Sequence, residues 1–120
     1  MEENLYTPFD YSYLGGSKMS TQFVKWEKPS QAIEALKKIG VRASYIPGHR
    51  KLIIRGRMEE VVLGVFGGIT IYQNNIEILF TEFKTTLRVI NEDTGDVLYI
   101  YLPKKSQAGY YKDYLWIVVG

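Results

Sequence analysis

Short runs of β-branched and aromatic residues, separated by turn-forming residues, fill the second half of the chain and restrict the folds that it can adopt. The runs are ITIY, IEILFTEF, TTLRVI and DVLYIYLP, between residues 69 and 103. Turn chemistry lies between them at Asn74-Asn75 and at EDTG, residues 92–95. This alternation predicts an antiparallel meander. The segment YLWIVV, residues 114–119, predicts one further strand.

The first half of the chain predicts a helix followed by a β-hairpin. TQFVKWE, residues 21–27, is typical of a short strand. Pro29 and Ser30 then open a helix that Gly40 ends, because proline is favoured in the first turn and glycine just after the last. The apolar side of this helix consists of Ala32, Ile33, Leu36 and Ile39. The runs VRASY and KLIIR flank Pro47-Gly48 and predict a hairpin over residues 41–55.

RMEEVVLGVFGG, residues 57–68, predicts a second helix. Its apolar residues recur at helical spacings and are followed by two glycines; they are Met58, Val61, Val62, Val65 and Phe66. The expected fold class is therefore α+β, with two short helices packed on a largely antiparallel sheet. We expect an irregular N-terminal arm, residues 1–20, followed by a single domain over residues 21–120.

Composition excludes several classes of protein. A chain of 120 residues suits one compact domain, and the absence of cysteine excludes disulfides and thiolate metal sites. No apolar run approaches the ~18 residues of a membrane span, and the acidic start MEENLYTPFD is no secretory signal. We expect a cytoplasmic protein, or an intracellular one in a host cell if viral, with no membrane partner. Heavy use of Ile, Tyr, Lys and Glu is similar to that of proteins from hyperthermophiles and their viruses.

Basic residues are concentrated in one block. The chain has a formal net charge of +2, yet residues 35–58 hold seven of its 15 cations and none of its 13 acids. Within the predicted hairpin, side chains alternate between two faces. One face holds Val41, Ala43, Tyr45, Arg50, Leu52 and Ile54, and the other holds Arg42, Ser44, Ile46, His49, Lys51, Ile53 and Arg55.

The second of these faces indicates binding to a polyanion, because each phosphate neutralised by a cation releases counterions. Lysines and tyrosines are also mixed in KKSQAGYYKDY, residues 104–114. Proteins that bind single-stranded nucleic acids combine cations with stacking rings in this way. We expect a small nucleic-acid-binding protein with little sequence specificity. The candidate contact residues are Lys37, Lys38, Arg42, His49, Arg50, Lys51, Arg55, Arg57, Tyr110 and Tyr111. The alternative is an ordinary solvated face whose charges protect strand edges and pair with acids elsewhere.

Catalytic signatures are lacking, and we predict no catalytic residue, cofactor or metal site. His49 is the only histidine and lies at the predicted turn. Glu59-Glu60 would lie in the first turn of the second helix, where negative charge is favourable, and Glu92-Asp93 in a hairpin turn. A metal-dependent enzyme assembled from scattered carboxylates stays open as a third alternative.

The two ends of the chain suggest a different function. The arm carries the aromatic residues Tyr6, Phe9, Tyr11 and Tyr13, and residues 114–119 form an apolar strand. Both features would suit a non-enzymatic structural protein that forms a homo-oligomer or a virion-type assembly by docking and edge pairing. Equally, the arm could fold back over its own sheet while the last strand is central.

Overall fold

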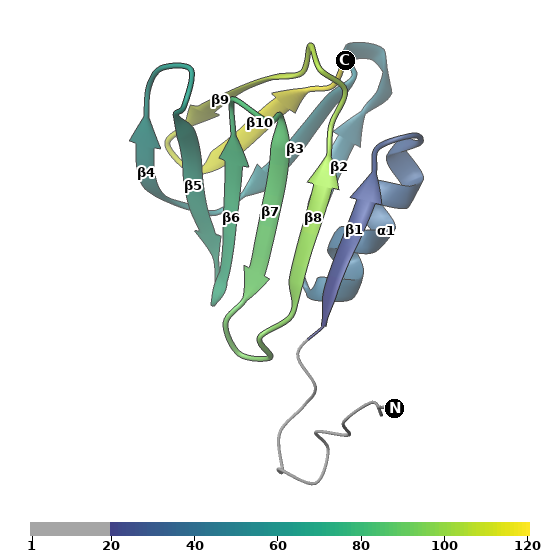
Figure 1. The fold of residues 1–120 in the computed structure, drawn as a ribbon, viewed down its shortest axis with the longest axis vertical. Coiled ribbons are helices and arrows are strands. Elements are labelled where there is room, and N and C mark those ends of the chain that lie inside the picture. The colour runs from purple at the N-terminus through teal and green to yellow at the C-terminus, as the bar shows by residue number, and fades with distance from the viewer. Residues whose placement is uncertain (1–19) are drawn as a thin grey trace, which may run out of the picture.

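Ten strands arranged in two sheets dominate the computed structural model, which describes residues 20–120 (Figure 1). The six-stranded sheet has the order β1 (Thr21–Lys25), β8 (Val97–Tyr101), β7 (Thr86–Asn91), β6 (Ile76–Thr81), β5 (Gly68–Gln73) and β4 (Arg57–Val62). The four-stranded sheet has the order β2 (Ala43–Ile46), β3 (Lys51–Arg55), β10 (Tyr114–Val118) and β9 (Gln107–Tyr111). Neighbouring strands are antiparallel except for β1 and β8, which are parallel.

The predicted meander is confirmed as strands β5 to β8. Burial alternates along β5 and β6, as expected for a sheet with one face on the core and one toward solvent. Asn74 takes a φ of 56° in the turn between these strands, a left-handed conformation that asparagine tolerates better than most residues.

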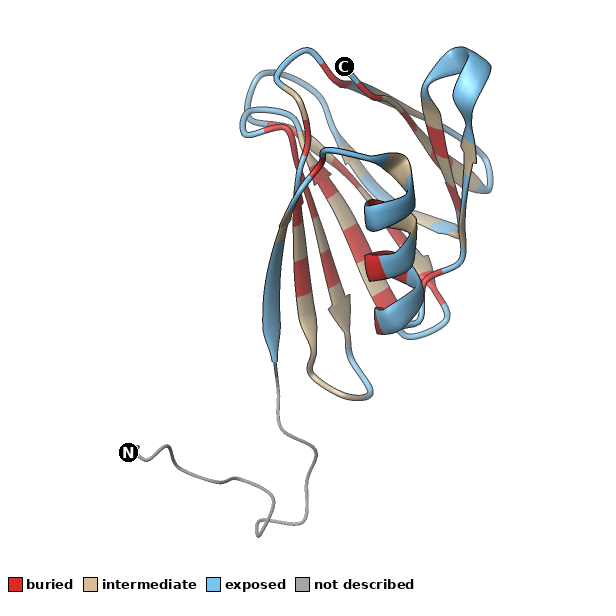
Figure 2. Ribbon diagram, turned by 90° about the vertical axis from the view of Figure 1, so that its right-hand side faces the viewer, coloured by how far each residue is buried: buried red, intermediate tan, exposed pale blue. Residues whose placement is uncertain are grey.

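The predicted first helix is confirmed as α1 (Pro29–Ile39), which lies between the six-stranded sheet and the β2–β3 hairpin (Figure 2). It ends at Gly40, whose φ is 103°. The Gly40 and Val41 amides donate hydrogen bonds to the carbonyl oxygens of Lys37 and Leu36, at 3.0 and 2.8 Å, which satisfies the last turn.

The predicted second helix is wrong. Residues 57–62 form β4, and a loop follows over residues 63–67. The register of β4 against β5 shifts between Met58 and Glu60, which marks a β-bulge. Because the extra residue resets the alternation of faces, Met58 and Val61 both turn toward the core although they are three residues apart. A bulged strand thus reproduced the spacing of a helix, and the fold is mostly β, with α1 as the one α-helix of the described region.

The space between the two sheets is filled by side chains that are less than 2% exposed. The largest of them are Leu36, Leu52, Ile54, Ile71, Ile78, Phe80, Leu87, Leu98, Ile100, Leu115 and Ile117. Helix α1 and every strand except β1, β2, β4 and β9 contribute to this list, so the strands with a free edge add least to the core. The two sheets and the helix therefore share one core.

The C-terminal strand is central. β10 pairs with β3 on one side and with β9 on the other, so it has no free edge for pairing with a second chain. No strand is predicted for residues 104–113, where the structure has β9. The predictions about the aromatic arm of residues 1–20 fall outside the described residues, apart from Ser20.

A buried glutamine joins the two sheets. Gln73, at the end of β5, accepts a hydrogen bond from the Arg42 amide at 2.7 Å through Oε1. Its Nε2 donates to the carbonyl oxygens of Arg42 and Arg55, at 3.0 and 2.9 Å. Gln73 is 6% exposed, so these bonds are largely shielded from water.

The chain passes from one sheet to the other at Gly56. The Gly56 amide donates to the carbonyl oxygen of Asp113 at 2.9 Å. A Cβ atom at this position would lie 2.5 Å from the carbonyl oxygen of Tyr72, closer than side chains approach a backbone oxygen. The crossing from β3 to β4 therefore requires glycine.

Substitution Gln73→Met should lower the free energy of unfolding by about 3 kcal/mol, because it leaves partly buried backbone groups of Arg42 and Arg55 without partners. Urea denaturation measures this effect. The control is Gln22→Met on the exposed surface of β1, which should stay within about 0.5 kcal/mol of wild type. Equal losses in the two variants would contradict the role assigned to Gln73.

Substitution Gly56→Ala should cost about 2 kcal/mol or more in the same assay, because the new methyl group overlaps the Tyr72 carbonyl. Gly48→Ala is a matched control, since nothing lies within 4 Å of a Cβ at that turn position. Wild-type stability of Gly56→Ala would show that the crossing does not need glycine.

Candidate nucleic-acid interface

The β2–β3 hairpin has the alternating faces predicted for its strand residues, while Arg42 precedes β2 and His49 and Arg50 lie in the turn. Ala43 lies opposite Ile54 and Tyr45 opposite Leu52, and the strands are joined through the 3-10 turn η2 (Pro47–His49) and Arg50. Leu52 and Ile54 are fully buried. The side chains of Ser44, Ile46, Lys51, Ile53 and Arg55 therefore lie on the outer face of the four-stranded sheet.

The outer face continues from β3 onto β10, where it becomes aromatic. Trp116 lies opposite Ile53 and Tyr114 opposite Arg55. The Lys51 Nζ atom is 5.3 Å from the centroid of the Trp116 ring, and the Arg55 guanidinium carbon is 5.7 Å from that of Tyr114. Both distances are typical of cation–π contacts.

The aromatic surface extends further onto β9. The Tyr111 ring centroid is 5.7 Å from that of Tyr114, and the Tyr111 side chain is exposed. Gly109 lies opposite Trp116, and a Cβ atom on Gly109 would overlap the Trp116 ring. The indole therefore lies across the backbone of β9. We call the set Lys51, Arg55, Tyr111, Tyr114 and Trp116 the aromatic–basic face.

Arg55 has only a loose acidic partner in the described region. Its guanidinium is 3.9 Å from the Asp113 carboxylate, and the two side chains are 73% and 70% exposed. An exposed pair at this distance contributes little, so the charge of Arg55 can be used for a ligand without breaking a strong interaction.

A depression of about 480 Å³ borders the aromatic–basic face. Arg42, Arg55 and Arg57 all line it, and we call it the arginine depression. Arg57 donates a hydrogen bond to Glu59 at 2.6 Å, and its guanidinium carbon is 5.3 Å from the centroid of the Tyr72 ring. Among the described residues, Arg42 and Arg55 of the arginine depression therefore have no carboxylate within hydrogen-bonding distance.

Tyr72 lies where the arginine depression meets the six-stranded sheet. Its hydroxyl donates to the carboxylates of Glu77 and Glu92, both at 3.3 Å. Desolvation, followed by the negative charge of these carboxylates, raises the pKa of Tyr72 above its ordinary value of 10.0. The phenol is thus held neutral, and Glu77 is shared with Arg88 at 3.3 Å.

The remaining predicted residues lie away from this surface. Lys37 and Lys38 are exposed in the last turn of α1. His49 and Arg50 are exposed in the hairpin turn, where Arg50 has a φ of 49° and its carbonyl oxygen accepts the Val119 amide at 2.8 Å. Their place at the end of the hairpin agrees with the predicted turn.

Tyr110 and Tyr111 point to opposite sides of β9. Tyr110 lies opposite the buried Leu115 and lines a different depression, between β9 and β4. Of the two predicted stacking residues, only Tyr111 joins the aromatic–basic face.

Two members of the face were missed in the sequence. Tyr114 and Trp116 occupy alternate positions in a strand whose intervening residues, Leu115 and Ile117, are buried. That alternation is a readable signal for a solvent-facing aromatic row. What it does not indicate is that β10 pairs with the basic strand β3.

Metal-ligating clusters and membrane-spanning helices are absent from the region from Ser20 to the C-terminus. It contains no group of three or more His, Cys, Asp or Glu side chains placed to hold a metal ion. No helix in it is long and apolar enough to cross a membrane. Comparison with protein-family models, curated proteins and solved structures gives no significant match.

Substitution Gly109→Ala should displace the Trp116 ring, because the new methyl group would occupy the same space. We expect acrylamide to quench the tryptophan fluorescence more strongly, since the other tryptophan, Trp26, is buried and contributes a constant background. Ala108→Ser on the opposite side of β9 is the control. Unchanged quenching in Gly109→Ala would contradict the packing of the indole on β9.

Proposed function

We propose that this protein binds single-stranded nucleic acid, with little sequence specificity, through the aromatic–basic face. The observation that carries the proposal is that Lys51 and Arg55 each lie over an aromatic ring on the solvent-facing side of one sheet. Rings on a sheet surface stack with unpaired bases, and cations beside them neutralise phosphates.

Trp116 is the principal stacking residue in this proposal. One side of its ring rests on Gly109, so a base can stack only on the other side. The Lys51 ammonium lies 5.3 Å from the centroid of the same ring. An arriving base displaces the ammonium from the ring. Lys51 then contacts the phosphate of the same nucleotide, which makes stacking and charge neutralisation a single event.

Tyr114 and Tyr111 extend the platform along the sheet, and the arginine depression receives the backbone. Arg55 belongs to both, so it links the rings to Arg42 and Arg57. Lys37, Lys38, His49 and Arg50 lie outside the contact surface. Lys37, Lys38 and Arg50 add to the positive potential that steers a polyanion toward it. Rings and cations recognise features that all nucleotides share, which accounts for weak sequence preference.

The first experiment is fluorescence anisotropy with labelled single-stranded DNA and RNA, and with a duplex, between about 50 and about 300 mM salt. Wild type should bind the single strands more tightly than the duplex. Lys51→Glu/Arg55→Glu should weaken binding and reduce the slope of log affinity against log salt by about 2, one for each lost phosphate contact. Lys25→Glu/Lys28→Glu changes the net charge equally at exposed positions elsewhere and should keep the wild-type slope.

The aromatic contribution is tested separately with Tyr111→Ala and Trp116→Leu. Each should lose about 1–3 kcal/mol of binding free energy with little change in salt dependence. Tyr111 is exposed, so its substitution leaves the fold intact and serves as the safer variant. Equal binding by wild type and the Lys51/Arg55 variant, or no binding at low salt, would overturn the proposal.

A further inference from the structure

Five apolar side chains project into solvent at one end of the molecule. They come from the last residue of β4, the β4–β5 loop and the β6–β7 turn, which lie at the same end of the six-stranded sheet (Figure 1). The exposed fractions are 51% for Val62, 85% for Leu63, 63% for Val65, 79% for Phe66 and 58% for Phe83. The rings of Phe66 and Phe83 are in contact, with centroids 4.9 Å apart. We call these residues the apolar tip.

The backbone of the loop holds the tip in its exposed arrangement. Gly67 is buried, and a Cβ atom on it would overlap the carbonyl group of Val62. The Gly67 amide donates to the Gly64 carbonyl at 2.9 Å, and the Gly67 carbonyl accepts the Glu82 amide at 3.0 Å. The loop therefore folds on its own backbone and is tied to the β6–β7 turn. Its large side chains point outward and expose apolar area to water. Contact with a partner would remove this area from water.

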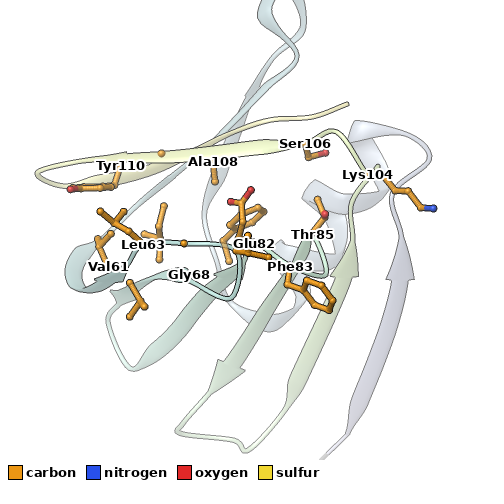
Figure 3. A pocket seen from close by; sticks show the side chains of 16 residues that line it. Val61, Leu63, Gly68, Glu82, Phe83, Thr85, Lys104, Ser106, Ala108 and Tyr110 are labelled. Atoms are coloured by element: carbon orange, nitrogen blue, oxygen red, sulfur yellow. The ribbon is translucent and has the colours of Figure 1, made fainter.

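Three lysines lie in loops at the same end of the molecule as the apolar tip (Figure 1). Lys84 follows Phe83 in the β6–β7 turn, and Lys104 and Lys105 lie in the β8–β9 loop at the same end of the molecule (Figure 1). Lys104 lines the same depression of about 580 Å³ as Val65 and Phe83 (Figure 3). Glu82 is the one acidic residue among the residues that line it.

We propose that the apolar tip inserts into the surface of a membrane that contains anionic lipids. Aromatic and aliphatic side chains on projecting loops suit the boundary between headgroups and acyl chains, and lysines at the same end suit the negative charge of the headgroups. The expectation of no membrane partner rested on the absence of an apolar span, and surface insertion needs none.

The chemistry of the tip favours lipid over a protein partner. Protein interfaces are enriched in arginine and depleted in lysine, whereas the three cations of the β6–β7 turn and the β8–β9 loop are lysines. Arg88, which lines a depression with Val62 and Phe66, is paired with Glu77. Lysine also places its ammonium at headgroup level while its apolar stem lies along the membrane boundary. No tip residue belongs to the aromatic–basic face, so this inference is independent of nucleic-acid binding.

The test is sedimentation of the full chain with vesicles of phosphatidylcholine alone and of phosphatidylcholine with phosphatidylserine. Wild type should bind the anionic vesicles more tightly. Leu63→Ser/Phe66→Ser should lose about tenfold or more in partitioning, and because both side chains are exposed the fold should be unaffected. Neutralising Lys84, Lys104 and Lys105 with glutamine should cost about fivefold for each lysine on anionic vesicles only.

Two controls separate the tip from the other surfaces. Phe23→Ser removes an aromatic side chain that is 65% exposed on β1, away from the tip, and should bind vesicles as wild type does. Lys51→Glu/Arg55→Glu should also keep vesicle binding while losing nucleic acid. If that variant alone loses the vesicles, adsorption occurs through the aromatic–basic face and the tip proposal fails.

Two further outcomes would overturn the inference. One is the absence of wild-type binding to anionic vesicles at low salt. The other is a dimer, detected by mass in solution, that Leu63→Ser/Phe66→Ser dissociates while vesicle binding stays at background, which would assign the tip to a second copy of the chain.

Discussion

The carboxamide of Gln73 fixes the relation between the two sheets. From β5 it satisfies backbone groups at the start of β2 and at the end of β3, in a partly buried position where each unmet hydrogen bond would be costly. The three arginines of the arginine depression, Arg42, Arg55 and Arg57, are all held close to this contact. The charged surface is thus built around a neutral amide that no ligand needs to touch.

Local patterns in the sequence predicted the parts of the fold that depend on local structure. The meander, the helix that ends at Gly40 and the two faces of the hairpin follow from turn chemistry and side-chain periodicity. The prediction of a helix over residues 57–68 was wrong because a bulge at Glu59 places Met58 and Val61 on one face of the strand. This spacing is the same as that on one side of a helix. Packing against β5 stabilises the strand over the helix for these residues. A window of sequence that covers only residues 57–68 does not include β5.

The candidate site was predictable by charge but not by its aromatic half. The block of cations identified Lys51 and Arg55. That Trp116 lies beside them depends on the pairing of β10 with β3, which joins Trp116 to Ile53 over more than half of the chain length. Tyr110 and Tyr111 show the same limit on a smaller scale. Once β9 is a strand, adjacent residues face opposite ways, so only one of the two reaches the basic face.

The parallel pairing of β1 with β8 has a consequence for how the chain acquires its structure. Ser20, which precedes β1, donates hydrogen bonds to Asp96, 76 residues further on. Closing so long a segment is slow, and the hairpins between these two strands form from near neighbours. During synthesis β1 therefore has no partner strand until β8 has left the ribosome. The beginning of this domain is among the last of its parts to be incorporated.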